Sequence, residues 1–245
     1  MKELLKIISE KVIPARYQLA LRYFYLKSTN KLEEEMLYAL NFLDKKRRFL
    51  DIGANVGIYS YFFKNIFKKV DAFEPLSEIT YRLKSIQDES LAVHNVALSN
   101  RTGELQFYIP LINGKTYPPL SSLEKRDIES EVRTVKVETI DGYDFNDVDL
   151  IKIDVEGHEQ SVIEGAQKVI EKNKPVLIVE IEQRHILNSI NEVFDYITNL
   201  NYSGFFIQKG RLTSLNEFSY ELNQKPYLDD VMNDEYINNF IFLPN

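Results

Sequence analysis

Short apolar segments that could form strands alternate with helical segments along most of this chain, and this alternation constrains the fold more than any other feature. In the first part we expect strands over 48–52, 69–73 and 91–95, separated by helices over 56–66 and 79–87. Strand–helix–strand units of this kind build parallel sheets with helices on both faces. We therefore predict an α/β fold with a Rossmann-like, mostly parallel sheet.

The alternation loosens in the middle of the chain and then resumes. Two strands are expected over 104–109 and 133–139, and a Pro-, Gly- and Ser-rich loop lies between them over 109–122. A strand, a helix, a strand and a helix then follow, in that order, over 148–154, 159–170, 176–181 and 190–200. Two further strands, expected over 205–208 and 239–243, close the chain, and we predict that they pair antiparallel.

Residues 1–46 precede the alternating region and are expected to be helical, with an interruption near Pro14. Apolar residues recur within them at helical spacing, namely Leu32, Met36, Leu37, Leu40 and Leu43. This stripe favours a helical extension that serves as a cap, as a lid or in assembly, which leaves a homo-oligomer open. We therefore divide the chain into an extension over 1–46 and an α/β domain over 47–245.

Composition excludes several classes of function. With no cysteine and three histidines, the chain has no disulfide, no thiolate metal site and little room for a histidine-rich metal centre. The 37 acidic residues outnumber the 30 basic ones, which argues against nucleic acid as a partner because phosphates favour clustered Lys and Arg. No apolar run approaches the ~20 residues of a transmembrane helix. We expect a cytoplasmic protein that acts on a small molecule.

The sequence FLDIGANVG at 49–57 predicts a strand that ends at an acidic residue and turns through glycines into a helix. Gly53 permits a tight turn and the close approach of a ligand, and Gly57 lets the helix begin near the strand. Asp51 places a carboxylate where dinucleotide-binding folds hold a pyrophosphate, so we expect a cationic or hydroxylated ligand. Glu74 ends the next strand, where α/β folds place a carboxylate on a ribose diol.

Several sequence blocks together resemble the FkbM-type class I S-adenosylmethionine-dependent methyltransferases. These blocks are FLDIGANVG (49–57), FEP (73–75), NVALS (95–99), SSL (121–123), VETID (137–141), DLIKIDVEGHE (149–159), GA (165–166) and NNFIFLP (238–244). The resemblance covers about 48–244 and leaves 1–46 outside. It implies a seven-stranded sheet with an antiparallel C-terminal strand, S-adenosylmethionine as cofactor, and methylation of a hydroxyl on a sugar, a glycan precursor or a polyketide-like metabolite.

The resemblance also implies a set of cofactor-binding residues: Asp51, Gly53, Ala54, Asn55 and Gly57 beside the methionine half, Glu74 at the ribose, Asn95 and Ala97 near the adenine, and Asp154 at the strand end beyond them. The charge of the cofactor also supports this assignment. A sulfonium cofactor is cationic and carries an ammonium group, which suits a carboxylate at a strand end.

Methyl transfer to a hydroxyl also needs a base, for which we consider His158, Asp154 and Glu180. His158 ranks first because an imidazole titrates near neutrality. In a second mechanism Asp154 and Glu180 bind Mg²⁺, which would acidify a coordinated hydroxyl, although no spacing in the sequence requires a metal. Lys152 and Asp154 share one face of their strand, which predicts an ion pair.

Ser121, Ser122 and Glu156 are our predicted substrate-binding residues, with the serines on a loop that could also close over the cofactor. Two alternatives remain open. An NAD-linked Rossmann oxidoreductase is disfavoured because the G-x-G-x-x-G fingerprint is missing. A non-catalytic protein that only binds the cofactor is compatible with the same residues.

Overall fold

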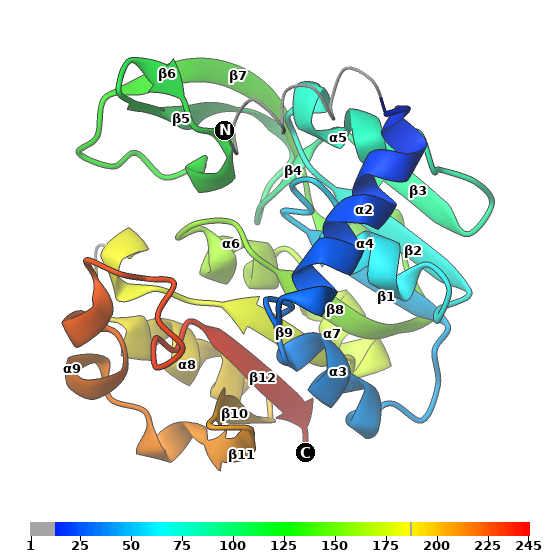
Figure 1. The fold of residues 1–245 in the computed structure, drawn as a ribbon. Helices are drawn as coiled ribbons and strands as arrows, with labels where there is room; N and C mark the ends of the chain where they lie inside the picture. The colour runs from blue at the N-terminus through cyan, green and yellow to red at the C-terminus, as the bar shows by residue number, and fades with distance from the viewer. Residues whose placement is uncertain (1–12, 187) are drawn as a thin grey trace.

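The structure is a computed structural model that describes residues 13–186 and 188–245. Figure 1 shows a large twisted sheet with helices on both faces and a smaller sheet above one end. The large sheet has the strand order β11-β10-β12-β9-β8-β1-β2-β3. Its strands are β1 (Arg48–Ile52), β2 (Lys69–Phe73), β3 (Leu91–His94), β8 (Val148–Ile153), β9 (Val176–Glu180), β10 (Tyr202–Gln208), β11 (Arg211–Ser214) and β12 (Asn239–Pro244).

The strands from β3 to β9 run parallel, and β12, β10 and β11 continue the sheet in antiparallel pairs. The predicted count of seven strands is therefore wrong, because the described residues form eight. The additional strand is β11, which forms a hairpin with β10. Lys209 and Gly210 turn between them with φ of +51° and +70°, as in the tight turns that suit twisted hairpins.

The smaller sheet has the order β4-β7-β5-β6. Its strands are β4 (Ala97–Leu98), β5 (Gly103–Ile112), β6 (Lys115–Thr116) and β7 (Ser130–Glu138). The strands expected over 104–109 and 133–139 correspond to β5 and β7, which pair antiparallel as a long ribbon. The segment between β6 and β7 folds back, since Tyr108 and Ser122 exchange main-chain hydrogen bonds of 2.8 and 3.1 Å.

Helices cover both faces of the large sheet. They are α2 (Ala15–Ser28), α3 (Glu35–Tyr38), α4 (Ile58–Phe63), α5 (Ser77–Lys84), α6 (Glu159–Glu164), α7 (Gln167–Asn173), α8 (Ile190–Asn199) and α9 (Tyr220–Asn223), with the 3-10 turns η1 (Ala39–Phe42), η2 (Pro118–Leu120), η3 (Ile140–Tyr143), η4 (Gln183–His185), η5 (Leu215–Glu217) and η6 (Lys225–Tyr227). The single helix expected over 159–170 is divided at Gly165, where a Cβ would lie 2.0 Å from the main-chain oxygen of Ser99.

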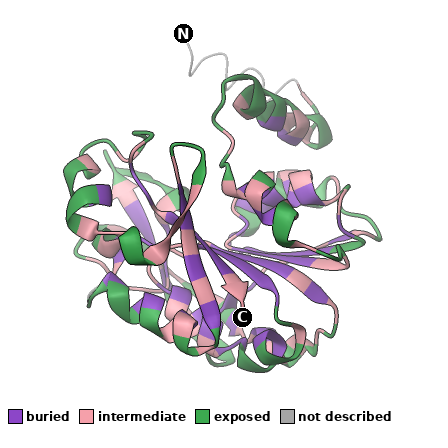
Figure 2. Cartoon of the chain, turned by 90° about the horizontal axis from the view of Figure 1, so that it is seen from below, coloured by how far each residue is buried: buried purple, intermediate pink, exposed green. Residues whose placement is uncertain are grey.

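The core lies on the two faces of the central strands (Figure 2). On one face Phe49 packs against Phe63 of α4, with ring centroids 4.6 Å apart. On the other face Ile151 and Ile153 belong to the cluster that α6, α7 and α8 cover. Each such side chain contributes roughly 1.5–3 kcal/mol to stability through burial.

The described part of the N-terminal extension packs on the α4 face. Leu19 of α2, Met36 of α3 and Ala39 of η1 are buried in the same cluster as Phe49. Residues 1–12, which belong to the predicted extension, lie outside the described residues. Within the described part of the chain, no helix has the length and apolarity that crossing a membrane requires.

Candidate active site

The loops that follow β1 and β8 meet at the centre of the large sheet, because these two strands are paired and parallel. The chain leaves β1 through Gly53, whose φ is +75°. A Cβ at Gly53 would lie 1.8 Å from the main-chain oxygen of Asp154, the first residue after β8. Glycine is therefore required there, both for the left-handed backbone and for the close approach of the two loops.

A cavity that opens to solvent lies at these strand ends and at the small sheet. Its apolar lining includes Phe73, Pro75, Val96, Ala97, Leu98, Phe107 and Leu123. Its polar lining includes Asn55, Glu74, Ser121, Asp154, Glu156 and His158. An apolar cavity with a few polar groups is typical of sites for small organic ligands.

A second cavity shares Gly53, Asn55 and Asp154 with the first. Its other polar lining comes from β1, α4, β8 and the N-terminal extension, through Asp51, Tyr59, Lys152, Arg22, Lys31 and Glu33. Ala54 also lines it. A ligand that extends from one cavity into the other would therefore pass beside Asp154.

Glu74 borders the first cavity in a fixed orientation. Its Oε2 accepts a hydrogen bond from the main-chain nitrogen of Asn55 (3.1 Å), and its Oε1 accepts one from that of Leu76 (3.0 Å). Burial raises the pKa of Glu74 to about 7. The loops after β1 and β2 thus hold one carboxyl group at the cavity wall before any ligand arrives.

Asn95 and Gly57 line neither cavity, although both are predicted cofactor residues. The Asn95 side chain donates to the main-chain oxygen of Glu74 at 2.9 Å. A Cβ at Gly57 would lie 2.8 Å from Leu83, so this glycine lets α4 pack beside α5. Both residues act on the site through the elements that they position, whereas Ala97 contacts the first cavity itself.

Asp51 is buried between β1 and α4. Its Oδ2 accepts hydrogen bonds from the main-chain nitrogen of Ser60 (2.9 Å) and from the Ser60 hydroxyl. Burial raises the pKa of Asp51 to about 6. This carboxyl therefore fastens the first turn of α4 to the sheet, and it borders the second cavity rather than the first.

Lys152 is fully buried on β8 with oxygen partners from two other strands. Its Nζ lies 3.5 Å from Glu180 Oε2 of β9 and 3.0 Å from Asn239 Oδ1 of β12. Glu180 and Asn239 are register partners across β9 and β12, so the long Lys152 side chain reaches both. The predicted interaction between Lys152 and Asp154 is corrected in part: the direct acidic contact of Lys152 is Glu180, whereas Asp154 interacts with Lys152 through its charge.

Asp154 and Glu180 are two carboxyls in one buried, charged region. Burial raises the pKa of Asp154 to about 7, and the nearby Lys152 ammonium opposes that shift. Burial also raises the pKa of Glu180 well above its ordinary value, and the Asp154 charge raises it further. A carboxyl that titrates near neutrality can take up or release a proton under physiological conditions. Glu180 itself lines neither cavity.

His158 is held at both ring nitrogens. Its Nδ1 lies 2.6 Å from Glu124 Oε1, and its Nε2 lies 2.9 Å from Ser99 Oγ. Ser122, on the same loop as Glu124, also contacts the segment after β8, because its hydroxyl donates to the main-chain oxygen of Val155 at 3.3 Å. Ser122 and His158 thus fasten the loop before β7 to the loop after β8. Sequence patterns give no signal for Ser99 or Glu124 as partners, since both are distant along the chain.

Two buried polar atoms in the described residues have no hydrogen-bond partner, namely Ser121 Oγ and Glu156 Oε2. Both residues line the first cavity. Glu156 has a left-handed backbone (φ +56°), and its Oε2 makes ion-pair contacts without hydrogen-bond geometry, 2.7 Å from His185 Nδ1 and 3.7 Å from Arg126 Nη1. An unpaired buried polar atom costs about 1–3 kcal/mol. A ligand that hydrogen-bonds Ser121 Oγ would recover that cost.

The Methyltransferase FkbM domain family matches residues 51–203, which is more than half of the chain. The matched region contains both strand-end loops and most of both cavity walls. It does not contain the N-terminal extension, which supplies Arg22, Lys31 and Glu33 to the second cavity. No curated protein matches the chain.

Solved structures share the fold. A methyltransferase FkbM from Methylobacillus flagellatus superposes with a TM-score of 0.52 at 17% identity, over 96% of this chain and 60% of that one. This chain therefore spans three fifths of the length of that protein. A putative rRNA methylase from Clostridium thermocellum superposes with a TM-score of 0.50 at 10% identity, over 86% of this chain and 94% of that one. At these identities the likeness concerns the fold alone.

Proposed function

This chain belongs to the FkbM methyltransferase family, and we propose that it transfers a methyl group from S-adenosylmethionine to a hydroxyl of a small molecule, with a sugar or glycan precursor as the acceptor class. The observation that carries the proposal is the position of Asp154, whose pKa is near 7 and which borders both cavities. One cavity can then hold the cofactor and the other the acceptor, with the carboxyl between them.

The residues of the first cavity fit this cofactor. Glu74 offers a fixed carboxyl for the ribose hydroxyls, and the apolar wall that contains Ala97 offers a surface for the adenine. The acidic groups at the junction favour a positively charged sulfonium. We assign Ser121 Oγ and Glu156 Oε2, which have no hydrogen-bond partner, to the cofactor rather than to the acceptor, because both residues line only the first cavity.

S-adenosylmethionine supplies an electrophilic methyl group, so the protein has to position the acceptor and remove its proton. In our mechanism the Asp154 carboxylate takes the proton of the acceptor hydroxyl at the junction of the cavities. Lys152 stabilises the negative charge on this cluster and supplies the cation beside Glu180, so the mechanism does not require Mg²⁺ at these carboxyls. His158 serves as a positioning residue, because both of its nitrogens are engaged.

We place the acceptor in the second cavity. The extension (1–46) then has a role distinct from that of the catalytic domain (47–245). It contributes Arg22, Lys31 and Glu33 to this cavity alone. Tyr59 of α4 donates a hydrogen bond to Glu33, which connects the extension to the catalytic domain. The extension would thus select the acceptor while the strand ends bind the cofactor.

Titration calorimetry should detect binding of S-adenosylmethionine and S-adenosylhomocysteine, and no binding of NAD. Glu74→Gln should weaken the affinity for both sulfur ligands by about 10- to 100-fold, since the loss of a charged hydrogen bond to the ribose costs roughly 1.5–3 kcal/mol. Glu104→Gln, an exposed residue of β5, is the matched control and should bind like the wild type. Binding of NAD without either sulfur ligand would instead identify an oxidoreductase.

An acceptor panel tests the substrate class. With a labelled methyl donor, we expect incorporation into free or nucleotide-linked sugars, and Glu33→Gln should raise the KM of the sugar several-fold with little change in the KM of the donor. The charge and position of Glu33 account for this difference, because it lines only the second cavity. Incorporation into an RNA fragment but into no sugar would contradict the proposed acceptor class.

A further inference from the structure

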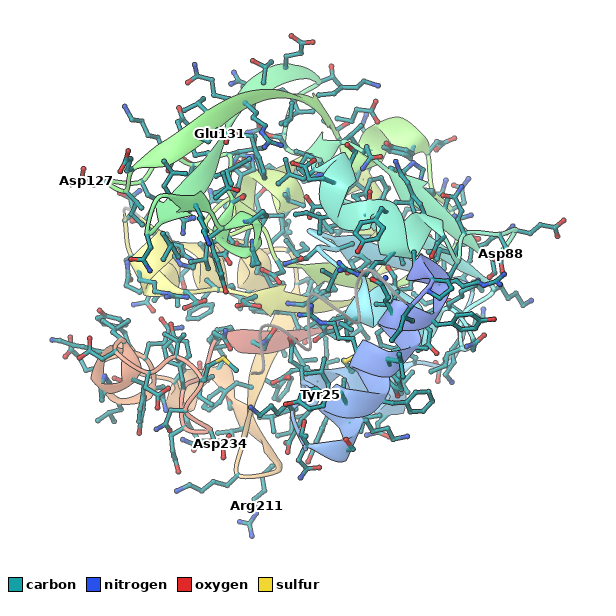
Figure 3. The ribbon with its side chains drawn as sticks, turned by 45° about the horizontal axis from the view of Figure 1, so that its top comes forward. Tyr25, Asp88, Asp127, Glu131, Arg211 and Asp234 are labelled. Atoms are coloured by element: carbon teal, nitrogen blue, oxygen red, sulfur yellow. The ribbon has the colours of Figure 1, made fainter. Side chains whose placement is uncertain are left out.

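The outward face of α2 carries a stripe of large apolar side chains. Tyr17, Leu21, Phe24 and Tyr25 are between 51% and 59% exposed. At about 100° per residue these four positions fall on one side of the helix, whereas Leu19 and Tyr23 are buried against the α4 face. Figure 3 places Tyr25 on this helix, and Figure 2 shows exposed residues along the side that is turned away from the sheet. Contiguous exposed apolar side chains of this size indicate a binding surface.

Basic residues flank this apolar stripe. Residues 13–31 contain Arg16, Arg22, Lys27 and Lys31 and no acidic residue, although the whole chain carries a net charge of −7. At helical spacing, Arg16 and Lys27 fall on one side of the stripe and Arg22 on the other. Glu33, in the acidic run that follows α2, accepts a hydrogen bond from Tyr59 of α4 and lines the second cavity, so this carboxylate faces the catalytic domain. Basic residues around an apolar and aromatic face are typical of helices that lie in a membrane interface.

We propose that this face of α2 docks onto an anionic lipid bilayer. The apolar side chains would enter the boundary between headgroups and acyl chains, and the exposed Arg16 and Lys27 would contact the lipid phosphates. A second copy of this chain fits the face less well. A symmetric dimer through α2 would bring the same basic groups against one another, and like charges in contact oppose such an interface.

Docking also has a consequence for the acceptor. Arg22 and Leu26 of α2 line the second cavity, so a docked α2 would hold that cavity beside the bilayer. An acceptor carried on a lipid anchor is the class that this arrangement serves. This second step rests on the proposed function, whereas the docking itself does not.

Vesicle sedimentation tests the docking with the full chain. The protein should sediment with vesicles of phosphatidylcholine and phosphatidylglycerol, and much less with phosphatidylcholine alone. Leu21→Ser combined with Phe24→Ser should reduce binding at least tenfold, because each buried side chain is worth about a factor of ten or more. Leu222→Ser combined with Met232→Ser is the matched control, since these side chains are 71% and 77% exposed and lie outside α2.

Tryptophan fluorescence provides a second measurement that keeps the face apolar. The chain contains no tryptophan, so Phe24→Trp introduces a single reporter. Its emission should shift to the blue on addition of anionic vesicles, whereas the emission of Leu222→Trp should not change. The proposal is wrong if anionic vesicles do not bind the protein, or if light scattering finds a dimer that the α2 double substitution dissociates. Vesicle binding without methyl transfer would retain the docking and reject only the proposed function.

Discussion

Asp154→Asn should lower kcat for methyl transfer by roughly 10²–10⁴-fold, the range expected for the loss of a general base. The substitution preserves size but removes both the group that accepts the proton and one of the acidic groups that favour the sulfonium, so kcat should fall far more than the affinity for S-adenosylmethionine. Burial raises the pKa of Asp154 to about 7, which makes the wild-type rate depend on pH. The base must be ionised to act, so kcat should fall as the pH drops through about 7.

The pH profile separates this role from a structural one. In Asp154→Asn the acidic limb near pH 7 should disappear, and the residual rate should no longer fall at low pH. His158→Ala is the comparison, because the sequence alone ranks this residue first as base. We expect the His158→Ala substitution to destabilise the loop after β8, while the pH profile of this variant retains the acidic limb. If Asp154→Asn kept full activity while His158→Ala lost the limb, the imidazole would be the base and our assignment would be wrong.

The sequence predicts those parts of the fold whose strands are covered on both faces. Four of the five residues of β9 are buried and form an uninterrupted apolar run, and four of the five residues of β1 are buried with Asp51 as the one polar residue among them. β11 gives no such signal, because Arg211–Ser214 is an edge strand without a buried residue. The two-residue strands β4 and β6 are too short for any pattern. The second sheet could therefore be predicted only as two isolated strands.

The strand-end rule predicts where Asp51, Glu74 and Asp154 lie, because the end of a strand is a local property of the sequence. It does not predict which groups each side chain meets. Asp51 accepts a hydrogen bond from Ser60, nine positions along the chain. Lys152 forms an ion pair with Glu180 on the neighbouring strand. These contacts depend on side-chain direction and on long-range pairing. The residue type of a candidate base is therefore a weaker guide than the partners that its atoms have in the fold.

Gly53→Ala should lower the free energy of unfolding by about 2–5 kcal/mol and methyl transfer by about 100-fold or more. A left-handed conformation costs an alanine roughly 1–2 kcal/mol. A Cβ would also lie 1.8 Å from the main-chain oxygen of Asp154, so the loop after β8 has to move. Overpacking costs another ~1–3 kcal/mol, and a displacement of about 1 Å near the reacting atoms can cost 100-fold in rate. Chemical denaturation and single-turnover kinetics measure the two effects separately.

Gly114→Ala isolates the steric part of this effect. Gly114 has nearly the same backbone, with φ of +71° against +75° for Gly53, yet a Cβ at Gly114 would meet no atom within 4 Å. This control should lose only ~1–2 kcal/mol of stability, which is the cost of the left-handed backbone, and should keep its activity. Equal losses of stability in the two variants, with activity kept in both, would mean that the loops after β1 and β8 do not touch. In that case Asp154 would not be fixed at the junction of the two cavities, and the assignment of the base would lose its geometric foundation.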